Sequence, residues 1–267
     1  MASLPGARLC GAAKKSRSKA DALSRQKLGQ HFLTNASILD RIAAAVCPAR
    51  EALVIEIGPG RGALTEKLLQ RADRVIAIEI DHALVEYLRE KYAAEPRLQI
   101  VHADVLTTDL GQWGPAPIAG NLPYYITSPI LELAARFRPP RAAFLMQKEV
   151  AERLVAKPGT REYGYLTVQT ALSAEARYLF EVKPGSFQPP PKVDSAVVLL
   201  TPTNSPAPPP DLLRFVGHCF SHKRKTLRNN LAGIYGKELV GSWPEASLRA
   251  EQIPIPQFAE MWKRVSA

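Results

Sequence analysis

The segment of the chain with the most specific chemical pattern is Gly120–Tyr125 (GNLPYY). The side-chain oxygen of Asn121 and the backbone carbonyl of Leu122 are hydrogen-bond acceptors, and Pro123 fixes φ and stiffens the turn that presents them. Such acceptors can orient an exocyclic adenine amine and stabilise the positive charge that develops when its nitrogen attacks an electrophile. Tyr124 can stack on the base, which helps to hold a flipped-out nucleotide.

A glycine-rich loop and two acidic residues are expected at the ends of three other strands. The segment Glu56–Gly62 (EIGPGRG) follows the first strand, where Gly58 and Gly60 let the backbone approach a ligand closely. Glu79 ends the second strand, where a carboxylate can accept hydrogen bonds from both hydroxyls of a ribose. Asp104 follows the third strand, where a carboxylate can accept from an adenine amino group. The joint placement of these residues predicts adenosine recognition.

These residues depend on a regular alternation of apolar runs and helical patterns from residue 52 onward. Strands are expected over 52–57, 74–79, 98–102, 117–120 and 142–146, and helices over 63–70, 82–92, 127–137 and 148–156. The alternation predicts a parallel, doubly wound sheet with helices on both faces, which strands near 177–182 and 195–200 complete. The expected fold class is therefore α/β, a Rossmann-like sheet with a small C-terminal helical domain.

The domain boundaries follow from composition. Thr201–Pro210 is rich in proline and is interpreted as a linker, and Asp211 is the expected N-cap of the helix that follows. We therefore expect a sheet domain over residues 26–205 and a helical domain over 206–267. Residues 1–25 are basic and predict a disordered tail, although their composition also suits an organelle transit peptide.

The chain carries a net charge of +10, from 35 basic and 25 acidic residues. Such an excess favours polyanions as partners. Four basic residues gather in one segment that we expect to be helical: Lys223, Arg224, Lys225 and Arg228. A second cluster is expected at Lys148, Arg153, Lys157 and Arg161. Both clusters suit contacts with RNA phosphates, and a solvated charged face is the alternative.

The positions of the cysteines and the hydropathy of the sequence indicate the cellular compartment of the protein. Cys10, Cys47 and Cys219 are far apart, which suits neither a disulfide framework nor a zinc site. No apolar run approaches the ~18–20 residues that a membrane helix needs. We therefore expect a cytoplasmic protein with no metal and no membrane partner.

Several segments together resemble one known family. Asn121–Tyr124 resembles the N6-adenine methyltransferase motif Asn-x-Pro-Tyr, and Leu28–Leu33 (LGQHFL) resembles the L-G-Q-N/H-F-L element of the small-subunit rRNA dimethyladenosine transferases, the kasugamycin-sensitivity family. Phe187–Ser195 (FQPPPKVDS) is similar to that family's F-x-P-x-P-K-V-D-S segment, and Phe220–Asn230 (FSHKRKTLRNN) to its F-x-x-R-R-K-T-L-R-N motif. The resemblance covers about residues 26–235 in the family's order.

The resemblance implies a reaction and a set of site residues. It implies S-adenosylmethionine as the cofactor, with contacts at His31, Leu33, Gly58, Glu79, Asp104 and Asn121. It places the target base beside Asn121–Tyr124, with Phe187 on the other face of the base. It implies dimethylation of the N6 amines of two adjacent adenines in the 3′-terminal hairpin of 16S rRNA, within an immature small ribosomal subunit. We expect the protein to act as a monomer.

Other interpretations remain open from the sequence. A large-subunit rRNA methyltransferase of the macrolide-resistance type shares the adenine motif, but the Phe187–Ser195 segment and the C-terminal match favour the small-subunit enzyme. An RNA-binding factor without activity would not need an intact glycine loop, Glu79, Asp104 and Asn121. A nicotinamide dehydrogenase would explain the glycine loop, because Gly58, Gly60 and Ala63 fit G-x-G-x-x-G/A. It would not explain Asn121–Tyr124, which in isolation would more often be a β-turn with buried aromatic rings.

Overall fold

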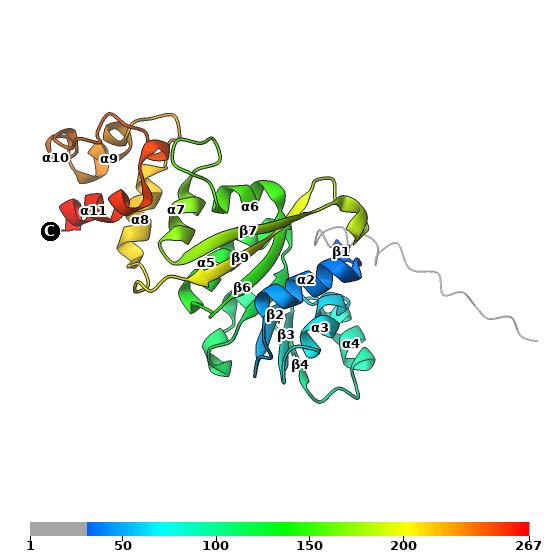
Figure 1. Cartoon of the computed structure of the whole chain (residues 1–267). Coiled ribbons are helices and arrows are strands. Elements are labelled where there is room, and N and C mark those ends of the chain that lie inside the picture. The colour runs from blue at the N-terminus through cyan, green and yellow to red at the C-terminus, as the bar shows by residue number, and fades with distance from the viewer. Residues whose placement is uncertain (1–30, 267) are drawn as a thin grey trace, which may run out of the picture. The chain divides into compact units, whose positions relative to one another are not determined.

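A mixed seven-stranded sheet forms the centre of the protein. The structure is a computed structural model and describes residues 31–266. The strand order is β4-β3-β2-β5-β6-β9-β7, and Figure 1 shows how the strands cross the molecule. Five strands are parallel: β2 (Val54–Ile57), β3 (Val75–Glu79), β4 (Leu98–His102), β5 (Ile118–Asn121) and β6 (Ala142–Gln147). The carboxyl ends of these strands therefore share one edge of the sheet.

One antiparallel strand of the seven-stranded sheet corrects the expectation of a parallel sheet. β9 (Ser195–Pro202) pairs antiparallel with β6 and with β7 (Ala174–Val182). A parallel connection needs a crossover of a dozen or more residues, usually a helix. The proline-containing segment between β7 and β9 forms only the short 3₁₀ turn Pro184–Ser186 and the two-residue strand β8 (Phe187–Gln188). The chain therefore returns antiparallel, and the sheet is of the mixed α/β type.

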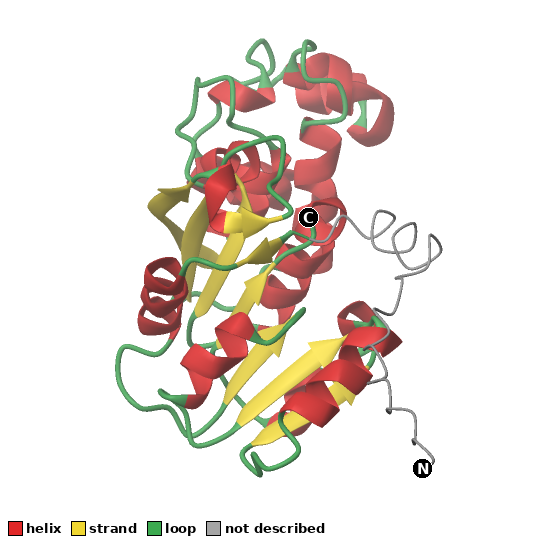
Figure 2. Ribbon diagram, turned by 90° about the vertical axis from the view of Figure 1, so that its right-hand side faces the viewer, coloured by secondary structure: helices red, strands yellow, loops and turns green. Residues whose placement is uncertain are grey.

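Helices cover both faces of the sheet, as Figure 2 shows. α2 (Ala36–Val46) and α3 (Ala63–Leu69) pack on one face, where they share a buried cluster with Val54, Val75 and Leu145. α5 (Thr127–Phe137) and α6 (Lys148–Leu154) pack on the other face, with Ile55, Phe144 and Met146. Successive strand residues thus enter opposite clusters, because side chains alternate across a strand. Burial on both faces explains why these strands are continuously apolar.

The helix α2 was not anticipated from the sequence. Asn35 is its N-cap and accepts a hydrogen bond from the Ile38 amide at 3.2 Å. Just before it, β1 (Phe32–Leu33) pairs antiparallel with β8, so that Leu33 lies opposite Phe187. The first described residues are therefore tied to the segment that precedes β9. Residues 1–25, expected to form a basic tail, and Leu28–Gln30 lie outside the described part of the chain.

The C-terminal helical region comprises α8 (Pro210–Cys219), α9 (Leu227–Tyr235), α10 (Lys237–Gly241) and α11 (Ile255–Ser266). Its buried cluster also contains Tyr163 and Val168, which belong to the connection after α6 and to α7 (Tyr165–Ala171). The Tyr163 hydroxyl donates to the Ile253 carbonyl at 2.7 Å and is fully buried. The helical region is thus packed together with a part of the chain that lies well before the expected boundary at residue 206.

Two local expectations in this region were wrong. Asp211 is not the N-cap of α8, because the helix begins at Pro210 and Pro209 is its cap residue. Proline suits the first turn, where an amide proton would have no partner. Lys223, Arg224 and Lys225 do not lie in a helix, because α9 begins only at Leu227, with Thr226 as its N-cap. The Thr226 hydroxyl accepts from the Asn229 amide at 3.4 Å, which favours a helix start there.

Candidate active site

The glycine-rich loop leaves the end of β2 in a backbone conformation that residues other than glycine rarely adopt. Gly58, Gly60 and Gly62 have positive φ angles of 66°, 59° and 80°. A Cβ atom at Gly60 would lie 3.0 Å from the ring of Phe32, so a larger residue there would also crowd that ring. Phe32, which sequence reasoning did not single out, therefore lies against this loop, and the Arg61 guanidinium lies 4.6 Å from the centre of its ring.

Glu79 occupies the end of β3 next to this loop. Its carboxylate accepts hydrogen bonds from three backbone amides, those of Gly60 at 3.2 Å, Ile80 at 2.9 Å and Asp81 at 3.0 Å. Burial raises the pKa of Glu79, and the three amide donors oppose that rise. The carboxylate is thus held in place beside the loop before any ligand binds.

Asp104 completes a row of polar groups along the same edge of the sheet. β3 and β4 are in register with Glu79 opposite His102, so Asp104 lies two residues beyond that pair. The Asp104 side chain caps a 3₁₀ turn and accepts from the Leu106 amide at 2.9 Å. The structure therefore brings the glycine loop, Glu79 and Asp104 to the ends of three adjacent strands, as the sequence predicted.

A second buried carboxyl group in this region was missed by the sequence analysis. Glu56 is only 1% exposed and accepts a hydrogen bond from the Thr65 hydroxyl at 2.6 Å. Burial, together with the nearby charge of Glu79, raises its pKa to about 8, against the lowering effect of the Thr65 hydrogen bond. At neutral pH most of Glu56 is therefore protonated. The signal in the sequence is a single acid inside the apolar run Val54–Ile57.

Asn121 is the last residue of β5 and lies close to the glycine loop. A Cβ atom on Gly58 would be 3.9 Å from the Asn121 carbonyl oxygen, and one on Gly120 would be 2.8 Å from the Ile57 carbonyl oxygen. The side-chain amide of Asn121 donates to the backbone carbonyl of His31 at 2.9 Å. Since the amide nitrogen is occupied in this way, the side-chain oxygen is left to act as an acceptor.

The turn after Asn121 is fixed by the sheet and by a distant serine. The Leu122 amide donates to the Leu145 carbonyl at 2.9 Å, which ties the Asn121–Leu122 peptide to β6. The Tyr124 hydroxyl lies 2.9 Å from the hydroxyl of Ser195, the first residue of β9. The rings of Tyr124 and His31 are 5.9 Å apart and tilted, and burial raises the pKa of Tyr124. Ser195 was not predicted to take part in the site.

The structure places the remaining predicted cofactor and base contacts on β1 and β8. His31 Nδ1 is hydrogen-bonded to the Pro189 carbonyl at 2.9 Å, and Leu33 is buried. Phe187 is 5% exposed and packs in the same buried cluster as Leu33. In the described conformation its ring is therefore covered, and stacking on a base would require the ring to move.

The two clusters of basic residues differ in exposure and in ion pairing, and in the first of them a guanidinium nitrogen of Arg228 donates to the Gly241 carbonyl at 3.4 Å. Lys223, Arg224, Lys225 and Arg228 are all exposed, although Lys223 Nζ donates to the Arg161 carbonyl at 2.6 Å. In the second predicted cluster Lys148 forms an ion pair with Glu181, and Arg153 forms one with Glu149. Such pairing leaves less positive charge for phosphates at these two positions than the sequence suggested.

Two further observations concern the described residues as a whole. None of the helices in residues 31–266 combines the length and apolar composition needed to cross a membrane. Within the same residues, no group of three or more histidine, cysteine or acidic side chains is arranged to hold a metal ion.

A family model described as "Ribosomal RNA adenine dimethylase" matches residues 22–263. The chain belongs to this family. The family is one of S-adenosylmethionine-dependent enzymes, so the chain is an rRNA adenine dimethyltransferase that uses this cofactor.

Relatives of this dimethylase extend over nearly the whole chain. A ribosomal RNA small subunit methyltransferase A from Legionella pneumophila (strain Corby) is 40% identical, over 91% of this chain and 98% of its own length. Its counterpart from Bordetella pertussis is 41% identical, over 88% and 91% of the two chains.

Solved structures agree with the fold. A dimethyladenosine transferase from Plasmodium falciparum superposes with a TM-score of 0.73 and 29% identity, over 86% of this chain and 96% of that one. The 23S rRNA methyltransferase ErmE superposes with a TM-score of 0.66 and 28% identity, over 88% of this chain and 100% of that one. The expected Rossmann-like methyltransferase fold is confirmed.

Proposed function

We propose that this dimethylase modifies the N6 amines of two adjacent adenines in the 3′-terminal hairpin of 16S rRNA, within an immature small ribosomal subunit. The small-subunit enzymes that are about 40% identical over nine-tenths of the chain support this choice of rRNA. The 23S-directed structural relative is more distant, at 28% identity. We further propose that the protein acts as a monomer in the cytoplasm.

The observation that carries the mechanism is the hydrogen bond from the Asn121 side-chain amide to the His31 carbonyl. It orients the Asn121 side chain so that its oxygen can accept from the target amine. The Leu122 carbonyl, which precedes the rigid Pro123, is the second acceptor. Two fixed acceptors hold the amine and stabilise the positive charge that grows on its nitrogen during attack. No side chain then has to remove a proton before the reaction.

Tyr124 positions the base in this mechanism. Its ring is a stacking surface for an adenine turned out of the RNA, and the bond between its hydroxyl and Ser195 fixes the direction of the ring. Phe187 is proposed to close the other face of the base after its ring is uncovered. Holding the amine in line with the reactive methyl group contributes through orientation alone.

The residues at the strand ends fit the cofactor. Gly58 and Gly60 give a ligand close access to the backbone, and the buried Glu79 carboxylate is an acceptor suited to ribose hydroxyls. Asp104 is the acceptor for the adenine amine, while His31 and Leu33 complete the cofactor contacts. When bound, S-adenosylmethionine would supply an electrophilic methyl group to the amine that Asn121 and Leu122 hold.

The exposed basic side chains of the C-terminal helical region are the proposed phosphate contacts. Lys223, Arg224, Lys225 and Arg228 lie on the loop before α9 and in its first turn. Phosphate contacts position an RNA without reading its sequence, and the shape of a folded hairpin supplies further selectivity.

The test of this function is to map methylated adenines in cells that lack the gene for this protein. Mass spectrometry of 16S and 23S rRNA fragments should show that two adjacent dimethyladenosines near the 3′ end of 16S rRNA are lost. The wild-type gene should restore them, and a gene carrying Asn121→Ala should not. Unchanged 16S modification, or a loss confined to 23S rRNA, would overturn the proposal.

A further inference from the structure

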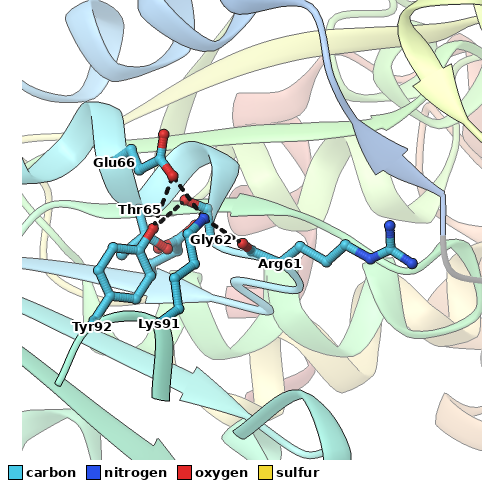
Figure 3. Close-up of polar contacts among 7 residues, drawn as sticks. Arg61, Gly62, Thr65, Glu66, Lys91 and Tyr92 are labelled. Carbon is cyan, nitrogen blue, oxygen red and sulfur yellow. Dashed lines mark hydrogen bonds and ion pairs between the residues drawn. The ribbon is translucent and has the colours of Figure 1, made fainter. Parts of the chain in front are cut away.

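Three consecutive residues of the glycine-rich loop are each held by a side chain from β3 or from α4 (His82–Lys91) and its C-cap residue. The Gly60 amide donates to Glu79 at 3.2 Å. Lys91 Nζ donates to the Arg61 carbonyl at 3.1 Å, and the Tyr92 hydroxyl donates to the Gly62 carbonyl at 2.9 Å. Figure 3 shows Lys91 and Tyr92 directed at these two carbonyls. Lys91 and Tyr92 belong to none of the motifs that the sequence analysis identified.

Glu66 of α3 connects the two donors. Its carboxylate is 2.7 Å from Lys91 Nζ and 3.3 Å from the Tyr92 hydroxyl, as Figure 3 shows. Lys91 Nζ also lies 5.0 Å from the centre of the Tyr92 ring. Burial raises the pKa of Tyr92 to about 12, so its hydroxyl remains a donor over the whole physiological pH range.

The shape of the loop is fitted to Tyr92. A Cβ atom on Gly62 would lie 2.6 Å from the Tyr92 hydroxyl oxygen and 2.8 Å from the edge of its ring. Gly62 also has a φ of 80°, which glycine adopts easily. A segment with three glycines in five residues has many accessible backbone conformations, so external contacts are needed to favour one of them.

We propose that Lys91 and Tyr92 are positioning residues of the cofactor site, which hold the Arg61 and Gly62 peptides in the conformation that binds S-adenosylmethionine. The inference rests on the proposed role of the glycine-rich loop in binding the cofactor. In this proposal both side chains act through the loop backbone, to which they are hydrogen-bonded. They set the fraction of molecules whose loop is ready to bind, and the apparent dissociation constant rises in proportion as that fraction falls.

This mechanism separates affinity from chemistry. Tyr92→Phe keeps the ring but removes the hydroxyl that bonds to Gly62. We expect S-adenosylmethionine to bind about 3–10-fold more weakly, the range for one net hydrogen bond. The single-turnover rate at saturating cofactor and RNA should not change, because the loop is then held by the ligand. Lys91→Met should act in the same direction, whereas Lys91→Gln, if its amide reaches Arg61, should recover part of the affinity.

The experiment is calorimetry with S-adenosylmethionine, paired with single-turnover methylation. Tyr87→Phe is the matched control for the tyrosine, because Tyr87 lies on the same helix and is 45% exposed. Arg89→Gln is the control for loss of a positive charge on α4. Both controls should bind the cofactor as the wild type does. Melting temperatures measured without ligand show whether each variant is folded. If Tyr92→Phe does not fold, Lys91→Met tests the proposal in its place.

The outcomes distinguish this inference from the function on which it rests. If Tyr92→Phe and Lys91→Met bind normally while Glu79→Ala binds weakly, the positioning role is overturned and the cofactor site stands. If Glu79→Ala also binds normally, the proposed cofactor site itself fails. A slower single turnover at saturating cofactor with unchanged affinity would likewise overturn the positioning role.

Discussion

The glycine-rich loop is held by side chains that are at most 30 residues away along the chain, whereas Asn121 and Tyr124 are held by contacts that span 90 and 71 residues. Glu79 ends β3, Lys91 ends α4 and Tyr92 is the C-cap residue of α4, and these two elements come next along the chain after α3. His31 and Ser195 come from opposite ends of the sheet domain. The glycine-rich loop and its supports are thus built locally, whereas the base side is built by the completed fold.

The two sides also differ in what can disturb them. The cofactor side depends on backbone conformation and on a carboxylate that is already buried. The base side depends on the orientation of an amide and of an aromatic ring. Variants on the cofactor side should therefore change affinity for S-adenosylmethionine, and variants on the base side should change the rate of transfer.

The largest effect is expected for Asn121→Ala. The variant loses an acceptor whose hydrogen bond strengthens during the reaction, so single-turnover methylation should slow by about 10²–10³-fold. RNA affinity should persist, because phosphate contacts dominate it. The ratio of monomethyl- to dimethyladenosine, measured over time, should also change, because a monomethylated amine has only one hydrogen left to donate.

Asn204→Ala is a suitable control for this variant, because Asn204 is an exposed asparagine between β9 and α8. A near wild-type rate for Asn121→Ala would remove Asn121 from the chemistry. If the variant were slow only because RNA no longer bound, Asn121 would be a structural residue of the turn.

On the cofactor side, Glu79→Ala should weaken S-adenosylmethionine binding by about 1.5–3 kcal/mol, the range for hydrogen bonds to a charged group. The raised pKa of Glu79 adds a pH dependence. The ionised carboxylate accepts from the ribose, so wild-type affinity should fall as the pH is lowered toward that pKa, and Glu79→Gln should not show this fall. Calorimetry over a pH series checks both, with Glu90→Gln on the exposed side of α4 as the control.

The combination of Lys225→Ala and Arg228→Ala tests whether RNA binding is separate from cofactor binding. RNA affinity should fall, and the slope of its logarithm against that of salt concentration should decrease by about 0.7–0.9 for each phosphate that the variant no longer binds. Affinity for S-adenosylmethionine should not change. Filter binding over a salt series measures the slope, with Lys237→Ala and Lys263→Ala as the charge-matched control. An unchanged slope would contradict the phosphate role.

Ser195→Ala should have the smallest effect. The Tyr124 ring remains, but it loses the hydroxyl partner that fixes its direction, and we expect single turnover to slow by about 2–10-fold, as for one ordinary hydrogen bond. Cofactor affinity should be unaffected. Tyr124→Phe removes the same bond from the other side, so the double variant should be no slower than either single one. Additive losses would show that the two hydroxyls act separately.

The difference between the two sides explains what could be predicted from the sequence. Gly58, Glu79 and Asp104 could be placed because each follows a recognisable strand, and parallel strands end at a common edge. The contacts of Asn121 with His31 and of Tyr124 with Ser195 could not, because they depend on pairings between distant segments. Lys91 and Tyr92 were missed for another reason, since a helix end carries no sign of which loop it will meet.

The errors in the fold have a similar origin. The reversal of β9 follows from the lack of a crossover helix between β7 and β9, which an apolar pattern alone does not reveal. The helical interpretation of Lys223–Lys225 came from spacing, but Thr226 is a good N-cap and the helix starts after it. In both cases the apolar or charged spacing of a segment predicted one structure, whereas the residues that connect it to its neighbours determined another.

Tyr163 limits how this enzyme can be recombined with its relatives. The residue precedes α7, yet it lies fully buried among the helices of residues 210–266, and its hydroxyl needs the Ile253 carbonyl. A chimera that joined the sheet of one dimethylase to the helical region of another at residue 206 would have to match this buried ring and its acceptor. A buried hydroxyl without a partner would cost about 1–3 kcal/mol. Because β7 and β9 lie between Tyr163 and residue 206, a single exchange point cannot keep both the sheet and this helical cluster within one parent.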